Sequence, residues 1–315
     1  SSLEMPAPGL DSARQLLEAV KAGQLSEGDI DERVDELLEI TIVTSNKIKP
    51  EDKEKMFEEN HALAREAARK SIVMLKNDGN ILPLKEAKKI AIIGDFAFTP
   101  RHQGAGSSLV NATNVENIEK VASEFDLNIV GMVKGYNRVE DNSDRAVIEE
   151  AIALASQADT VLYFFGLNEA SESEGLDRTH LRIPKNQVEL LTKIENVNKN
   201  VVGIISAGSC IEMPWQQHLK AILHGYLFGQ AGMGAVFEIL TGKYSPSGKL
   251  AESIVKKYED EPNIKYYPSR ERTSEYRESI FVGYRYFSKV NVPVLYPFGY
   301  GISYTDFKYS DIAVD

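Results

Sequence analysis

The sequence has 315 residues, of which 43% are hydrophobic and 26% charged, as is typical of a soluble globular protein with a substantial core. A net charge of −11 argues against nucleic-acid and anionic-membrane partners, because phosphate binding requires clustered Lys and Arg side chains. The single cysteine excludes an intrachain disulfide, and no apolar run is long enough to span a bilayer. Residues 1–9 lack the features of a signal peptide, but this carries little weight because the sequence reads as if it starts inside a longer protein. The scarcity of cysteine fits a cytoplasmic location.

Residues 1–45 are predicted to form a loop and two helices. The first helix begins near Asp11 and ends at Gly23. The second begins after Ser26, which with Asp29 makes a variant of the capping box. Its apolar side chains recur at helical spacing, at Ile30, Val34, Leu37 and Leu38. Two helices cannot bury such faces alone, so we expect them to pack on another part of the protein.

Residues 46–59 are charged and contain a proline, as a linker does, and a helix over about 56–70 and a turn at Asp78-Gly79 follow. Strands and helices then alternate. The expected strands are Lys89–Gly94, Leu127–Met132, Val161–Phe165, Val201–Ser206 and Ala221–Leu227, and the expected helices are one capped by Ser143, 186–197 and 231–241. Because the strands are apolar on both faces, the pattern predicts an α/β fold, a mostly parallel sheet flanked by helices, over 60–255.

The character of the sequence changes after Lys249. Residues 256–280 are charged and rich in tyrosine, and the aromatic stretch that follows is interrupted by Gly and Pro. Residues 306–315 alternate as one β-strand would. We therefore expect 256–315 to be an irregular segment that ends in a strand.

The loop after the expected strand Val161–Phe165 concentrates four acids, Glu169, Glu172, Glu174 and Asp177. It leaves the carboxyl end of the strand, where open α/β sheets bind ligands. Gly175 gives Glu174 an adaptable backbone that can project its carboxyl outward. Crowded carboxylates raise one another's pKa, as a general acid requires, and Asp177 and Arg178 are expected to pair and support the loop. The alternative is a solvated acidic loop.

A second polar loop, Thr99–Ser108, follows the first expected strand and so lies at the same edge of the sheet. The side chains there that could bind a polyhydroxylated or anionic ligand are Arg101, His102, Gln103, Ser107 and Ser108. Its glycines do not form a nucleotide fingerprint, since G-x-G-x-x-G must stand directly between strand and helix. A purely structural loop is the alternative. The histidines show no metal-ligand spacing, so we expect no metal and no cofactor. We expect Cys210 to be buried, and Trp215 to fill the core in preference to the alternative, a platform that stacks on a sugar.

A series of longer motifs covers nearly the whole chain in a characteristic order. The motifs are KSIVMLKNDGNILPL, IAIIGDFA, RHQGAGSS, GLNEASESEGLDRTHLRIPKNQ, EMPW, SPSGKL, VGYRYF and YPFGYGISYT. In this order they closely resemble the β-glucosidases of glycoside hydrolase family 3. The resemblance implies that 1–45 are the last helices of a (β/α)8-type catalytic barrel and that 60–255 are an α/β sandwich. It also implies that 306–315 lead toward a fibronectin-like domain.

The resemblance further implies retaining hydrolysis of terminal β-linked glucose by two carboxylates. The acid/base of the family's E-G-x-D-R motif corresponds to Glu174, whereas the nucleophilic aspartate belongs to a barrel segment that this sequence does not contain. The implied partners are a β-glucoside or cello-oligosaccharide and a polypeptide segment that carries the barrel. Arg101, Gln103, Ser107 and Ser108 would line the cleft. The alternatives are an inactive isolated fragment, or the same enzyme class acting on another sugar, as a β-xylosidase or exo-β-glucanase.

Overall fold

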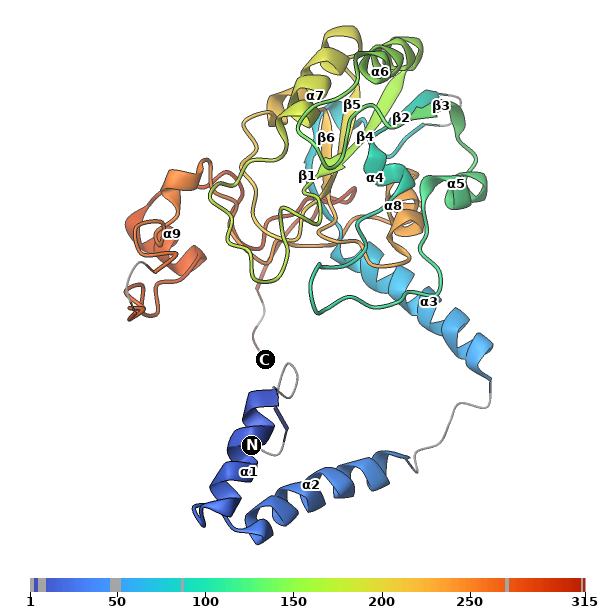
Figure 1. The fold of residues 1–315 in the computed structure, drawn as a ribbon. Coiled ribbons are helices and arrows are strands. Elements are labelled where there is room, and N and C mark those ends of the chain that lie inside the picture. The colour runs from blue at the N-terminus through green and yellow to red at the C-terminus, as the bar shows by residue number, and fades with distance from the viewer. Residues whose placement is uncertain are drawn as a thin grey trace. The chain divides into compact units, whose positions relative to one another are not determined.

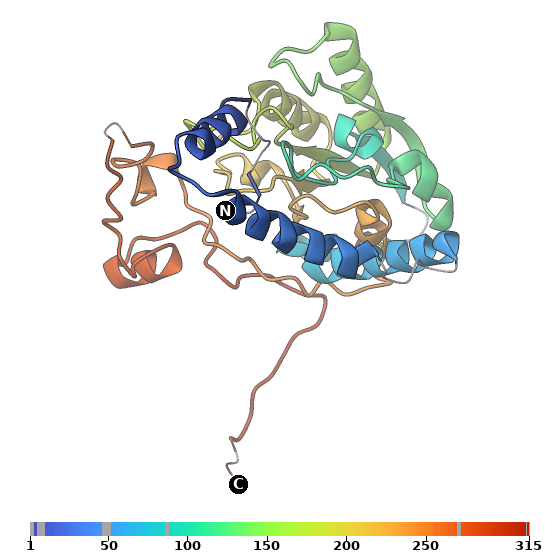
Figure 2. The ribbon, with the colours of Figure 1, turned by 60° about the horizontal axis from the view of Figure 1, so that its bottom comes forward.

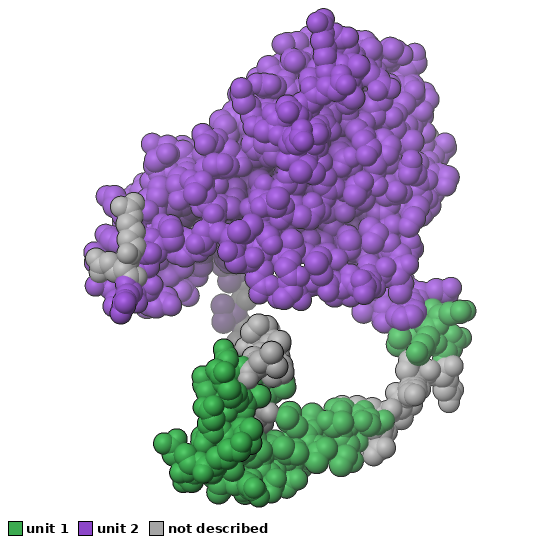
Figure 3. Space-filling model, viewed as in Figure 1, with its two compact units in different colours: residues 1–56 green, residues 57–315 purple. Residues whose placement is uncertain are grey.

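A computed structural model of the protein describes residues 3–4, 10–45, 52–85, 88–269, 272–312 and 314. They belong to two compact units, which divide between Met56 and Phe57 (Figure 3). Among the described residues, none of the helices combines the length and the apolar character that crossing a bilayer would require.

The first unit consists of α1 (Leu10–Lys21) and α2 (Glu27–Ser45). The predicted capping box at the start of α2 is confirmed: the Asp29 amide donates to Ser26 Oγ at 3.2 Å, and the Ser26 amide donates to Asp29 Oδ2 at 3.0 Å. No side chain of α2 is buried, and apolar ones such as Val34 remain exposed. The apolar faces predicted from the sequence therefore lack cover within the described residues.

Helix α3 (Lys53–Ser71) begins earlier than predicted. Asp52 stabilises its first turn, because the Lys55 amide donates to Asp52 Oδ1 at 2.9 Å. Residues 53–59 of the segment predicted as a linker are therefore helical, and 46–51 lie outside the described residues. The charged side chains that suggested a linker are Lys and Glu, which are also good helix formers.

The core of the second unit is a six-stranded sheet in the order β1-β6-β5-β4-β2-β3. The strands are β1 (Val73–Asn77), β2 (Lys89–Ile93), β3 (Asn128–Val133), β4 (Thr160–Gly166), β5 (Val201–Ser206) and β6 (Ala221–His224). All neighbours are parallel except β1, which pairs with β6 in the antiparallel sense. The expected mostly parallel sheet is confirmed, and β1 is an additional edge strand that the alternation pattern did not predict.

Helices cover both faces of the sheet (Figure 1). They are α6 (Arg145–Gln157) and α7 (Lys185–Val197) on one face, and α4 (Asp95–Phe98), α5 (Ile118–Val121) and α8 (Gly232–Leu240) on the other. From β2 to β3 the chain moves one way along the sheet, and after β3 it moves the other way. Because connections between parallel strands are right-handed, the helices before and after β3 lie on opposite faces of the sheet. Asp144 caps α6 by accepting from the Ala146 amide at 2.8 Å. The predicted cap, Ser143, is wrong, since its hydroxyl accepts from the Asn137 amide instead.

The strand order reverses between β2 and β4. From β2 the chain moves outward to β3, returns across β2 to β4, and then continues to β5 and β6. The helices that follow β2 and β4 therefore lie on opposite faces of the sheet at this point. In doubly wound sheets such a switch point is where ligands bind.

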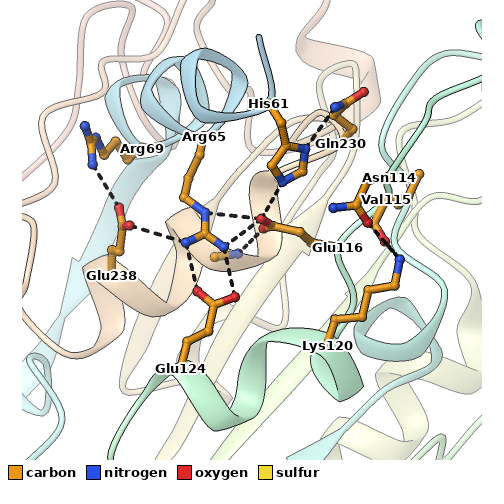
Figure 4. Close-up of polar contacts among 11 residues, drawn as sticks. His61, Arg65, Arg69, Asn114, Val115, Glu116, Lys120, Glu124, Gln230 and Glu238 are labelled. Atoms are coloured by element: carbon orange, nitrogen blue, oxygen red, sulfur yellow. Dashed lines mark hydrogen bonds and ion pairs between the residues drawn. The ribbon is translucent and has the colours of Figure 1, made fainter. Parts of the chain in front are cut away.

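Helix α3 is held against the rest of the second unit by a polar network around Glu116 (Figure 4). The buried Glu116 carboxylate accepts from Arg65 Nη2 at 2.6 Å and from the Gly234 amide at 2.7 Å, and lies 2.9 Å from His61 Nε2. Arg65 also donates to Glu124 at 2.9 Å. The network joins α3, the loop before α5 and the start of α8, so a buried carboxylate has its charge and lone pairs satisfied.

The C-terminal segment packs on the sheet and then leaves it. Ile254 bridges to Tyr296 and Met74 to Ile302, and a short helix, α9 (Tyr284–Val290), precedes the second of these contacts. The strand predicted for 306–315 is wrong over the described residues 306–312, which lead away from the body of the second unit (Figure 2). A strand needs a neighbouring strand, and none lies beside this alternating stretch.

Candidate active site

The two polar loops predicted to share one edge of the sheet do meet, at the switch point between β2 and β4. Ala105 and Ser173 form a parallel β-bridge. The Glu174 amide donates to the carbonyl of Ala105 at 3.1 Å, and the Ser107 amide donates to Glu174 Oε2 at 2.8 Å. The loop after β2 therefore fixes both the backbone and the carboxylate of Glu174.

Gly106 makes this close approach possible. Its φ of +108° is one that side-chain-bearing residues rarely adopt. A Cβ at this position would stand 2.5 Å from the Cβ and 2.7 Å from Oε2 of Glu174. The glycine that superficially suggested a phosphate cradle is thus required for contact between the two loops.

Glu174 itself is exposed, and no cation among the described residues forms an ion pair with it. Its hydrogen bonding with Ser107 holds the pKa of the Glu174 carboxyl below the ordinary value. The expectation that neighbouring acids raise this pKa is wrong for the chain as described. The other acids of the loop have partners elsewhere and do not crowd Glu174.

Glu172 lies only two residues earlier but is partly buried, with a side chain 9% exposed. It forms an ion pair with Arg101 and accepts from the Gly208 amide at 3.0 Å and the Ser209 amide at 2.8 Å. Burial alone would raise the pKa of Glu172, but bonds from Ser209 and Gly208 and the Arg101 charge outweigh it and leave the pKa below its ordinary value. The loop of Glu174 is thereby fixed to the loops that follow β2 and β5.

The side chains predicted to line a cleft have different positions. Arg101 is only 2% exposed and also donates to the Leu167 carbonyl at 3.2 Å, so it supports the acidic loop from beneath. Gln103 is engaged with Val110, donating to its carbonyl at 3.1 Å and accepting from its amide at 2.9 Å. Ser107 and Ser108 are exposed beside Glu174. Of this group, the two serines are therefore the residues open to a ligand.

Asp177 and Arg178 do not form the expected charge pair with each other. Asp177 accepts a short hydrogen bond from the hydroxyl of Tyr267. Arg178 donates to Ser209 Oγ at 2.9 Å and to the Cys210 carbonyl at 2.8 Å. Both residues hold the loop, but through separate partners. Sequence inspection missed Ser209 and Tyr267, because nothing in their local sequence marks them as contacts of a loop far away in the chain.

The remaining reactive side chains are structural. Trp215 is buried and packs edge-on against Phe165, with ring centroids 4.9 Å apart, so its predicted place in the core is confirmed. Burial raises the pKa of the Cys210 thiol to about 12, which leaves no reactive thiolate. Within the described ranges, no three His, Cys, Asp or Glu side chains come together as metal ligands would.

The family described as "Glycosyl hydrolase family 3 C-terminal domain" matches residues 72–304. The match covers the whole sheet, both loops at the switch point and the C-terminal segment up to Tyr304. The chain belongs to glycosyl hydrolase family 3. The resemblance inferred from the motifs is thereby confirmed.

Relatives support the same assignment over nearly the full chain. The chain is 40% identical to thermostable beta-glucosidase B of Acetivibrio thermocellus and 37% identical to an exo-alpha-(1->6)-L-arabinopyranosidase of Bifidobacterium breve, in each case over 99% of its length. A crystal structure of a Bifidobacterium adolescentis GH3 beta-glucosidase superposes with a TM-score of 0.83 at 37% identity and covers 95% of this chain and 44% of that one. The chain spans 42% of the length of these two curated relatives.

Proposed function

We propose that this chain is the acid/base half of a retaining β-glucosidase and that Glu174 is its general acid/base. The observation that carries the proposal is the position of Glu174, an exposed carboxylate without a cation partner among the described residues, at the switch point of the sheet. Its neighbour Glu172 has a different environment, since it is partly buried and ion-paired. Of the two acids, only Glu174 is free to approach a ligand.

In this mechanism Glu174 protonates the departing glycosidic oxygen while a second carboxylate attacks the sugar from its other face. The same residue then deprotonates the water that releases the glycosyl-enzyme. Retention requires the two carboxyl groups to be about 5–5.5 Å apart. The nucleophile comes from a barrel segment that this chain does not span, since the chain corresponds to 42% of its relatives' length. The proposal gives the exposed Ser107 and Ser108 the role of binding a sugar hydroxyl.

The low pKa of Glu174 has a direct consequence for this role. A general acid must be protonated near neutral pH, whereas the Ser107 amide favours the charged form of Glu174. Covering of the loop by the barrel, the nearby nucleophilic carboxylate and loss of water when substrate enters all raise a carboxyl pKa. We infer that the acid function is completed only when the barrel is in place.

The role of Glu174 is tested by Glu174→Ala in the complete enzyme. Hydrolysis of cellobiose, which has a poor leaving group, should fall by about 10²- to 10⁴-fold, the usual contribution of general acid catalysis. The kcat/KM for 2,4-dinitrophenyl β-glucoside, whose leaving group departs without protonation, should fall far less. Glu169→Ala, at an exposed acid of the same loop, is the matched control and should leave the ratio of the two rates unchanged. Equal losses on both substrates in Glu174→Ala would exclude the role.

A different glycone is the second candidate. It is favoured by the exo-alpha-(1->6)-L-arabinopyranosidase of Bifidobacterium breve, which is 37% identical over 99% of this chain. Glucosidase and arabinopyranosidase relatives therefore share this part of their structure, and the sugar is selected largely by the part that the chain does not span. Kinetics of the complete enzyme on aryl β-glucosides, β-xylosides and α-L-arabinopyranosides identify the sugar, and a comparison of cellobiose with a β-glucan polymer separates a β-glucosidase from an exo-β-glucanase.

The proposed barrel also has to cover the helices of the first unit. Apolar side chains there, such as Leu16, Leu17 and Leu38, are each about half exposed. Uncovered apolar faces of this kind favour association, so the isolated 315-residue chain should self-associate and hydrolyse no glucoside. Light scattering that finds a monomer at high concentration would contradict the proposal that a barrel covers these helices. Turnover by the chain alone would contradict the proposal that the barrel is needed for activity.

A further inference from the structure

The acidic loop has a second anchor at its start, apart from the ion pair of Glu172 with Arg101. Asn168, the second residue after β4, is 6% exposed. Its Nδ2 donates to the carbonyl of Arg138 at 2.8 Å, and its Oδ1 accepts from the amide of Ser171 at 2.9 Å and from the hydroxyl of Ser171 at 2.8 Å. One buried side chain therefore closes the first turn of the acidic loop and ties it to the loop that follows β3.

Arg138 is in turn fixed to the loop that follows β2. Its side chain is 10% exposed, and Nη1 donates to the carbonyl of Thr99 and lies 3.6 Å from Oδ2 of Asp95. The guanidinium carbon lies 4.4 Å from the centre of the Phe96 ring, a distance at which cation–π attraction is favourable. Because β2 lies between β3 and β4 in the sheet, Arg138 joins three loops at the switch point.

The loops that meet at Arg138 include the two that hold Glu174. The loop after β4 carries Glu174, and the loop after β2 carries the Ser107 amide that donates to its carboxylate at 2.8 Å. Arg138 also forms an ion pair with Glu169, but that acid is half exposed, so the pair contributes little. Asn168 is buried, and removal of a buried hydrogen-bond partner is costly, so its bond to Arg138 is the stronger constraint.

We propose that Asn168 and Arg138 are positioning residues, which hold the loops so that the Glu174 carboxyl group points at the glycosidic oxygen. This role in the reaction rests on the proposed function of Glu174, whereas the anchoring of the loop does not. Misplacement of a reacting group by about 1 Å can lower the rate by about 10²-fold. Because the contacts of Glu172 and Ser107 remain when Asn168 is changed, we expect a smaller loss, of about tenfold.

Asn168→Asp in the complete enzyme tests the proposal. Aspartate keeps the acceptor for Ser171 but replaces the donor by an oxygen that faces the Arg138 carbonyl. The kcat/KM for cellobiose should fall by about tenfold and that for 2,4-dinitrophenyl β-glucoside far less, because only cellobiose needs proton donation to its leaving group. Simple loss of folded protein would lower both values equally. Asn142→Asp, the same change at an exposed asparagine, is the control and should leave the ratio of the two values unchanged.

Arg138→Met is a second, independent variant. It removes the guanidinium without leaving Asp95 unpaired, because Lys134 Nζ lies 2.9 Å from Oδ1 of Asp95. It should lower the same ratio of cellobiose to dinitrophenyl glucoside. In the Glu174→Ala background neither change should lower the ratio further, because a positioning residue acts only through the group that it positions. A further fall of about tenfold in either double variant would overturn the proposal.

Hydrogen exchange of the complete enzyme tests the anchoring separately. Asn168→Asp should accelerate exchange of the amides of 171–174, whereas Asn142→Asp should not. Unchanged exchange would overturn the proposal, as would faster exchange with an unchanged substrate ratio while Glu174→Ala changes that ratio. Failure of the proposed function is distinguishable, because Glu174→Ala would then leave the ratio unchanged and the accelerated exchange would persist.

Discussion

Replacement of Glu172 by Gln tests whether the ion pair between Glu172 and Arg101 stabilises the acidic loop. Glu172 and Arg101 form a buried ion pair whose side chains are 9% and 1% exposed. In Glu172→Gln the Arg101 guanidinium loses its counter-charge inside the protein. In addition, the new amide group brings a donor toward the amides of Gly208 and Ser209, which are donors themselves.

Removal of one partner from a buried ion pair typically costs about 3–5 kcal/mol, because the other charge stays buried and uncompensated. We therefore expect Glu172→Gln to lower the free energy of unfolding by about this amount. Replacement of both partners, as in Arg101→Met with Glu172→Met, should cost less than the two single changes together, since no unpaired charge remains. Urea denaturation of the single and double variants measures these differences.

The effect of Glu172→Gln depends on pH in a defined direction. The pKa of Glu172 is depressed in the folded chain, so its carboxylate stabilises the fold fully above the ordinary value of 4.5, and this stabilisation is lost as the pH falls through the depressed pKa. The difference between the wild-type protein and Glu172→Gln should therefore narrow in acid. Glu169→Gln removes an acid that is half exposed and should cost at most about 1 kcal/mol. Equal costs for the two variants would refute the argument.

Two other positions give further predictions. Burial lowers the pKa of His224 to about 4, so the free energy of unfolding should fall by about 3 kcal/mol as the pH falls from about 6.5 to 4. In urea titrations, His224→Leu should reduce this dependence on pH. The same dependence in the variant and the wild-type protein would contradict the prediction. Gly106→Ala should separate the two loops, because the added Cβ overlaps Glu174, and hydrogen exchange of the Glu174 amide should therefore accelerate. An unchanged exchange rate would show that the close contact between the loops does not require a glycine at position 106.

The sheet could be predicted from the sequence because its central strands are apolar on both faces and alternate with helices. The edge strand β1 (Val73–Asn77) was missed, since a short antiparallel strand before a turn breaks that alternation. The prediction of a strand at 306–315 is wrong because an alternating pattern does not by itself provide a neighbouring strand. Periodicity describes which residues can be buried, whereas pairing depends on what lies beside them.

The candidate site can be predicted from the sequence only at the level of the loops. Parallel strands place their carboxyl ends at one edge, so the meeting of the loops that carry Ser107 and Glu174 follows from the strand pattern. Arg101 pairs with Glu172, and this pairing depends on the tertiary structure. The sequence alone does not distinguish Glu172 from the other acids of the loop. The predicted pKa of Glu174 was wrong because Glu172 turns inward and Asp177 binds Tyr267, so the acids are not crowded.

The central claim is that Glu174 donates and accepts the proton at the glycosidic oxygen, and chemical rescue tests it most directly. In the complete enzyme, Glu174→Ala leaves space beside the glycosyl-enzyme for a small anion that needs no general base. Sodium azide should then accelerate turnover of 2,4-dinitrophenyl β-glucoside and yield β-glucosyl azide as the product. Absence of rate enhancement, together with glucose as the sole sugar product, would contradict the claim.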